Sequence, residues 1–184
     1  MKIITLWKKE VLNYATSLRA YVLVALLTAF SALWFFVVNL WQVRDSSMRG
    51  VTVFLSFLLL AITPILTMRT LAEENSRGTL ELLLTSPVRE WDIVLGKFLG
   101  ALTLYMTLFA ITLIFPLILF QVSEPEKGPL FTQYLGLVLS SAAFISVGIF
   151  ASAITESQVI AAITGYVLLL AFWIIGLFAQ ILPT

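Results

Sequence analysis

Long apolar runs separated by short polar connections make up most of the chain. A helix needs about 20 mostly apolar residues to cross roughly 30 Å of hydrocarbon. Uncharged runs of about this length predict transmembrane helices at residues 20–43, 50–68, 98–123, 130–154 and 158–182. The outer connections are too short to hold an extracellular binding domain. The pattern therefore predicts an all-α polytopic membrane helical bundle that forms a single transmembrane domain over residues 1–184.

Residues 1–17 follow a different pattern. On a helical wheel Ile3, Leu6, Trp7, Val11 and Tyr14 fall on one arc, and the lysines fall mostly opposite. This predicts an amphipathic elbow helix in the membrane interface, with its apolar face in acyl chains and its lysines toward anionic headgroups. An ordinary positively charged flank is the alternative interpretation.

The lysines and arginines predict the orientation of the bundle. A cytoplasmic N-terminus puts eight of them inside and three outside, which is the bias expected for cytoplasmic segments. We therefore expect a multi-pass protein of the plasma (inner) membrane whose N-terminus and polar segment 69–97 are cytoplasmic.

Composition restricts the chemistry. The chain is 60% hydrophobic and 11% charged, with no cysteine and no histidine, so zinc sites and Ser-His-Asp or Cys-His catalysis are excluded. The predicted spans lack Asp, Glu, Lys and Arg, which disfavours proton-driven transport. An intramembrane hydrolase would lack a base for its serines. A net charge of +1 gives no reason to propose nucleic acid as a partner. We expect no catalytic residues, no metal and no cofactor in this chain.

Two prolines, Pro64 and Pro116, lie inside the second and third spans. Each removes a backbone donor and is expected to kink its helix, and the hydroxyls of Thr63 and Thr112 are placed to bond the freed carbonyls. The kinks are interpreted as static, with a hinge as the alternative.

Small and polar residues suggest how the spans pack and end. Residues spaced four apart allow close helix approach. Such pairs are Gly136 with Ser140, Gly148 with Ser152, and Ala161 with Gly165. Thr155 and Gln158 fit a capping box, which predicts that Thr155 N-caps the last helix and Glu156 lies at its positive end. Asn39 lies near a span end, where we expect interfacial water to hydrate it.

The segment 69–97 is expected to form a structured hairpin of three pieces. The second span is predicted to continue as a polar helix through Arg69 and Arg77 until Gly78 stops it. Thr79 can then N-cap a short leucine-rich helix. Ser86-Pro87 is a strong start for a third helix, with acidic residues near its positive end, that runs into the third span.

Four glutamates share this hairpin with leucines. A surface that only faces anionic lipid is expected to be basic, whereas a mixed acidic and apolar surface suits a protein partner. An ordinary helical hairpin at the lipid surface is the alternative.

The stretch "MRTLAEENSRGTLELLLTSPVREWDIVLGKFLG" closely resembles the signature region of type-2 ATP-binding-cassette (ABC) transporter permeases, especially the gliding-motility-like branch. An elbow helix and the "SQVIAA" opening of the fifth span are also similar to that family. The matching positions are Met68, Arg69, Glu73, Glu74, Gly78, Thr79, Glu81, Leu82, Leu83, Pro87, Gly96 and Lys97.

The resemblance implies that the hairpin docks onto a cytoplasmic ABC ATPase subunit and that the Thr155–Gln158 turn makes a smaller contact. No G-x-x-x-x-G-K-[ST] phosphate loop is present in this sequence, so ATP and Mg are expected in the partner. A second permease copy or paralogue and the lipid bilayer complete the expected partners. The predicted coupling residues are Glu73, Glu74, Arg77, Gly78, Thr79, Glu81, Leu83, Pro87, Arg89 and Glu156.

The family pattern has six spans, whereas five are predicted here. A truncated or split permease and a relative that works with five spans are both consistent with this count. The functional alternative is a non-transporting membrane scaffold that tethers a cytoplasmic protein through residues 69–97.

Overall fold

The computed structural model describes residues 2–42, 47–76, 89–122 and 127–181, and these contain helices and no strand. Five of the described helical stretches are long and apolar enough to cross a membrane, which confirms the all-α membrane bundle. The helices are α1 (Lys2–Thr16), α2 (Leu18–Phe35), η1 (Phe36–Gln42), α3 (Arg49–Thr67), α4 (Ala72–Ser76), α6 (Glu90–Thr112), α7 (Ile114–Val122), α8 (Lys127–Ala153) and α9 (Gln158–Ile181).

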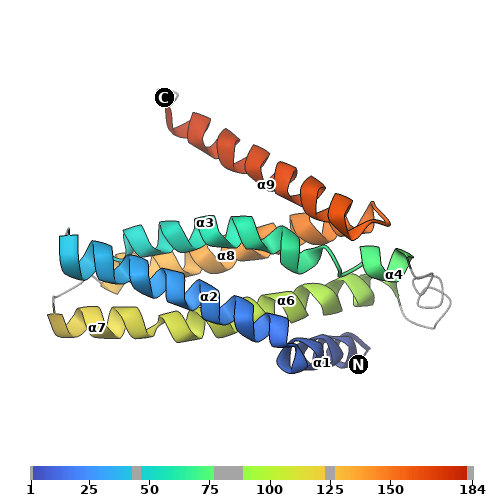
Figure 1. Ribbon diagram of the computed structural model, residues 1–184, viewed down its shortest axis with the longest axis horizontal. Coiled ribbons are helices and arrows are strands. Elements are labelled where there is room, and N and C mark those ends of the chain that lie inside the picture. The colour runs from blue at the N-terminus through green and yellow to red at the C-terminus, as the bar shows by residue number, and fades with distance from the viewer. Residues whose placement is uncertain (1, 43–46, 77–88, 123–126, 182–184) are drawn as a thin grey trace.

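The long helices α2, α3, α6 and α8 run side by side along the long axis of the molecule, and α7 extends the line of α6 (Figure 1). Helix α9 contacts α8 and α3 at one end of the bundle and leans away from them toward the C-terminus (Figure 1). The core between the helices is apolar and includes Leu27, Leu59, Tyr105 and Ile145, all fully buried.

The far end of the bundle has its own aromatic and aliphatic cluster. Phe35 stacks on Phe115 with ring centroids 5.1 Å apart, and α2 passes into the π-helix η1 directly after Phe35. Asn39 in η1 is buried, and its amide donates to the Ser47 carbonyl at 2.9 Å. The expectation that interfacial water hydrates Asn39 was therefore wrong, because η1 turns this side chain toward the protein.

Helix α3 continues through Pro64, and the Met68 N–H donates to the Pro64 carbonyl at 2.9 Å. The Thr63 hydroxyl donates to the Leu59 carbonyl at 2.6 Å and shares a 2.9 Å hydrogen bond with the buried Tyr105 hydroxyl. The carbonyl that Pro64 deprives of its helical partner belongs to Leu60. The prediction that Thr63 serves this carbonyl was wrong, because its hydroxyl reaches one residue further back.

Pro116 lies in the first turn of α7, which begins at Ile114 just after α6 ends at Thr112. Pro116 frees the Thr112 carbonyl, and the Tyr134 hydroxyl of α8 donates to it at 3.0 Å. The Thr112 hydroxyl donates instead to the Phe109 carbonyl at 2.9 Å. A side chain of a neighbouring helix therefore bonds the carbonyl that Pro116 frees, whereas the sequence predicted that a hydroxyl of the same helix would do so.

Candidate functional site

The polar segment begins with a turn followed by a separate short helix. Helix α3 ends at Thr67, and α4 begins at Ala72. The N–H and hydroxyl of Thr70 both donate to the Thr67 carbonyl, at 3.0 and 2.6 Å, and close the turn. The predicted continuous helix from the second span through Arg69 was therefore wrong. We refer to residues 67–76 as the hairpin root.

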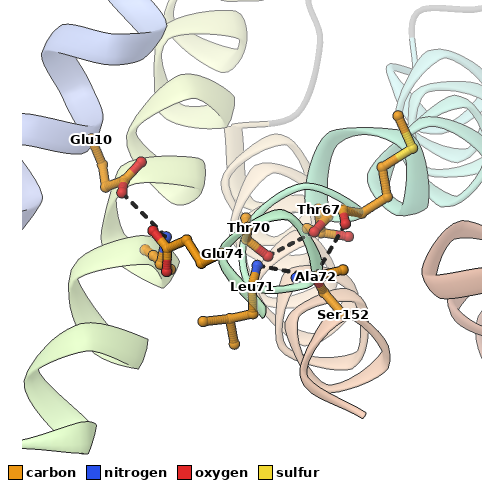
Figure 2. Close-up of polar contacts among 9 residues, drawn as sticks. Glu10, Thr67, Thr70, Leu71, Ala72, Glu74 and Ser152 are labelled. Atoms are coloured by element: carbon orange, nitrogen blue, oxygen red, sulfur yellow. Dashed lines mark hydrogen bonds and ion pairs between the residues drawn. The ribbon is translucent and has the colours of Figure 1, made fainter. Parts of the chain in front are cut away.

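Ser152, near the end of α8, holds the hairpin root in place. Its buried hydroxyl accepts from the Leu71 and Ala72 N–H groups at 3.1 and 3.0 Å and donates to the Met68 carbonyl at 3.2 Å. Figure 2 shows Ser152 lying against this turn. The first N–H groups of a helix lack partners within it, so one side chain caps α4 and also closes the end of α3.

Close packing of α3 on α8 brings Ser152 within reach. A Cβ at Gly148 would lie 2.9 Å from the Thr67 Cβ and clash with the Thr67 hydroxyl. Only glycine fits at this point. The sequence pairing of Gly148 with Ser152 as a close-approach motif is confirmed, as is that of Ala161 with Gly165, since Gly165 packs against Ala151 and Pro64.

Lys97 of α6 joins the hairpin root to α1. Its ammonium lies 2.7 Å from Glu74 Oε1 of α4 and 3.5 Å from Glu10 Oε1 of α1, and Figure 2 shows the Glu10 and Glu74 side chains pointing toward one another. Lys97 is 7% exposed. A buried ammonium is costly without partners, and here two acidic residues from different helices supply them.

Helix α1 packs along α6 over two glycines four residues apart. A Cβ at Gly96 would lie 2.8 Å from the Leu6 Cβ, and one at Gly100 would lie 2.6 Å from the Glu10 Cβ. Both distances are too short for carbon atoms, so the helices can approach this closely only at glycine. Trp7 completes the contact by donating from Nε1 to the Thr103 hydroxyl at 2.9 Å.

The helix predicted over residues 1–17 is present as α1. Its apolar arc, which was expected in acyl chains, instead faces α6 through Leu6 and Trp7, together with Glu10. The physical reason is that Gly96 and Gly100 carry no side chain, so α1 can pack directly on this face of α6. Burial, and secondarily the neighbouring Glu10 carboxylate, raise the pKa of the Tyr14 hydroxyl on the same face, so Tyr14 is neutral over the physiological range.

The predicted coupling residues within the described ranges lie at one end of the bundle. Glu73 and Glu74 are on α4, which contacts α9, and Glu156 is exposed in the turn between α8 and α9. Arg89 is exposed directly before α6. The other predicted residues lie outside the described ranges, as does Ser86; they are Arg77, Gly78, Thr79, Glu81, Leu83 and Pro87.

Two predicted helix starts differ from the structure. Helix α6 begins at Glu90, because Arg89 has extended backbone with ψ 144°, so the helix predicted from Pro87 does not run unbroken into the third span. Helix α9 begins at Gln158, and the Thr155 hydroxyl donates to the Ser157 carbonyl at 3.0 Å. Thr155 is therefore not the N-cap of α9, because the N-cap position is Ser157, two residues later, whose carbonyl accepts from the Ala161 N–H at 2.9 Å.

The fold and the hairpin root define a polytopic all-α membrane protein with a polar, helix-anchored segment between its second and third spans. The family model described as "ABC-2 family transporter protein" matches residues 13–184. The chain belongs to this ABC-2 transporter family.

Curated relatives agree with this family. The chain is 29% identical over 94 residues to the "Probable multidrug ABC transporter permease YbhR" of Escherichia coli (strain K12), and the same values hold for the protein of that name from E. coli O157:H7. The match covers 51% of this chain and 25% of the relative. No solved structure matches the chain.

Several residues of this site escaped the sequence prediction. Gly96 and Gly100 form a G-x-x-x-G spacing, which signals close helix packing and could have indicated the α1 contact. Glu10 carries a charge on the apolar arc of α1, and no local pattern indicates its ion pair with Lys97. The contact of Ser152 with Leu71 joins residues 81 positions apart, and no local pattern indicates it.

Proposed function

We propose that the chain is a permease subunit of an ABC transporter. It couples ATP hydrolysis by a separate cytoplasmic subunit to export, or to force transmission, across the plasma (inner) membrane. The observation that carries the proposal is the anchoring of α4, in a member of the ABC-2 family, by Ser152 and Lys97. A segment tied to α1, α6 and α8 can pass a displacement of its tip to several helices together.

The proposed energy source is the partner subunit. The chain has no phosphate loop, and the middle stretches of its spans carry no charged residue that could relay protons. ATP and Mg would therefore bind to the ATPase, and this chain would need no cofactor.

The proposed assembly pairs this chain with a second permease copy or a paralogue, with two ATPase subunits beneath them. The N-terminus would be cytoplasmic, as the lysine and arginine bias favours. Membership of the gliding-motility-like branch rests on the resemblance of residues 68–100 and is part of the proposal.

Two acidic residues at the hairpin root have different proposed roles. Glu74 is engaged by Lys97 inside the chain, so we assign it to positioning the segment. Glu73, on the same short helix, and Glu81 are assigned to docking the ATPase, because acidic groups beside leucines suit a protein surface.

Co-purification with the ABC ATPase encoded beside this chain tests the proposal. Reversing Glu73 and Glu81 to lysine should weaken association and abolish the stimulation of ATPase turnover. A double variant that reverses Glu124 and Glu126 is the matched control, since it changes the same charge in the connection predicted on the opposite side. Unchanged association and stimulation in E73K/E81K would refute the coupling assignment. Association without any change of turnover in the unaltered chain would favour the scaffold.

A further inference from the structure

A cavity of about 600 Å³ lies beside the hairpin root, between α1, the start of α2, the end of α3 and α6. Its volume falls in the range of about 300–1,000 Å³ typical of small-ligand sites. One part of the wall is apolar and includes Leu23, Ile65 and Leu66. The charged residues of the wall are Glu10, Arg19, Arg69, Glu73, Glu74 and Lys97.

The charges of this wall are not equally available. Lys97 is buried between Glu10 and Glu74, so these three groups are engaged with one another. Arg19 and Arg69 are exposed and form no ion pair with any residue in the described ranges. A guanidinium group offers a planar fork of donors that matches phosphate oxygens. The cavity therefore presents two arginines suited to phosphate oxygens, with the Glu73 carboxylate also in its wall.

Apolar surface continues beyond the cavity. A second cavity of about 250 Å³ lies between α1, α2 and α6, and Tyr14 and Ala20 line both cavities. Val24 and Leu104 are among the residues of its mainly apolar wall. A ligand with a phosphate at the arginines would therefore have hydrocarbon surface on two sides.

The two arginines occupy matching positions along the bundle. Arg19 is the second residue of α2, and Arg69 follows the end of α3 by two residues, so both lie where an apolar helix ends. This is the level at which lipid phosphates meet basic side chains. The amphipathic helix α1 lies at the same end (Figure 1).

We propose that this cavity binds a phospholipid, with its phosphate between Arg19 and Arg69 and an acyl chain along Leu23, Ile65 and Leu66. The bound lipid contacts both α1 and the hairpin root. The inference does not depend on the ATPase partner, because every group that it uses belongs to this chain.

Native mass spectrometry of the full chain, titrated with phosphatidylglycerol in detergent, tests the proposal. We expect a one-to-one adduct that R19Q/R69Q weakens about 30-fold, since each basic residue near an anionic lipid contributes about fivefold. The matched control R49Q/K127Q removes two exposed cations from the opposite end of the bundle and should bind as the unaltered chain does. Diacylglycerol with the same acyl chains should bind at least about 10-fold more weakly, because it lacks the phosphate.

Three results would overturn the proposal. Equal weakening in R49Q/K127Q would assign the binding to general surface charge. Equal binding of diacylglycerol would show that the phosphate is not recognised. Displacement of the lipid by an equal concentration of soluble glycerol phosphate would make a free phosphate ester the ligand.

Discussion

Replacing Lys97 with methionine removes the ammonium that joins α1, α4 and α6 and keeps a side chain of similar length. The contact with Glu74 is a charge-assisted hydrogen bond of 2.7 Å, which contributes about 1.5–3 kcal/mol. The contact with Glu10 is longer, at 3.5 Å, and the Glu10 side chain is 20% exposed, so we assign it about 0.5–1 kcal/mol. The variant should therefore lose about 2–4 kcal/mol of unfolding free energy.

Thermal unfolding in detergent micelles measures this loss. For a chain of this size about 1 kcal/mol corresponds to roughly 2–4 °C in Tm, so K97M should unfold roughly 4–16 °C below the unaltered chain. The matched control is Lys9→Met on the exposed side of α1, which should change Tm by less than about 2 °C, since an isolated surface charge contributes little.

A double-mutant cycle with Glu74→Gln separates the ion pair from other effects of the substitution. Because the two groups are in contact, the coupling energy should be about 1–2 kcal/mol. Equal Tm values for K97M and K9M, or a coupling energy of zero, would contradict the assignment of Lys97 as the link between the elbow helix and the hairpin root.

Three further predictions concern the helix contacts. Gly100→Leu should push α1 away from α6 at a cost of about 1–3 kcal/mol, because even a Cβ there would lie 2.6 Å from the Glu10 Cβ; faster tryptic cleavage after Lys8 and Lys9 would report it. Tyr134→Phe should leave the Thr112 carbonyl at the Pro116 kink without its donor and cost about 0.6–1.7 kcal/mol in thermal unfolding. The raised pKa of Tyr14 means that above pH of about 10 the unfolded chain releases this proton while the folded chain keeps it. The free energy of unfolding must therefore fall as the pH rises through this range. Between pH of about 9 and 11, the Tm of Tyr14→Phe should fall by less than the Tm of the unaltered chain.

The membrane helices could be predicted because their signal is local. A run of about 20 uncharged residues has few alternatives to a spanning helix, and the described helices α2, α3, α6, α8 and α9 lie where such runs occur. The small residues of α8 predicted close packing correctly at Gly148 but not at Gly136, where an added Cβ would meet no heavy atom within 4 Å. Composition and spacing were sufficient in these cases because each property belongs to a single helix.

The hairpin root could not be predicted in the same way, because distant residues determine it. The residues around Arg69 are compatible with a continuing helix, and the turn forms because Ser152 supplies competing hydrogen bonds. The apolar arc of α1 is equally compatible with lipid or protein, and the glycines of α6 decide between them. Helix faces can be derived from periodicity, whereas their partners depend on the tertiary arrangement.

The position of Ser152 also affects how the chain matures during synthesis. The Ala72 N–H group donates to the Ser152 hydroxyl, which is synthesised 80 residues later. At about 5–20 residues per second, the ribosome needs roughly 4–16 s to supply it, and α8 must then insert beside α3. During that interval the start of α4 lacks its cap and Glu74 already has Lys97 within the emerging chain. The newly made chain is therefore expected to remain accessible to chaperones and proteases at the hairpin root until its fourth span is in place.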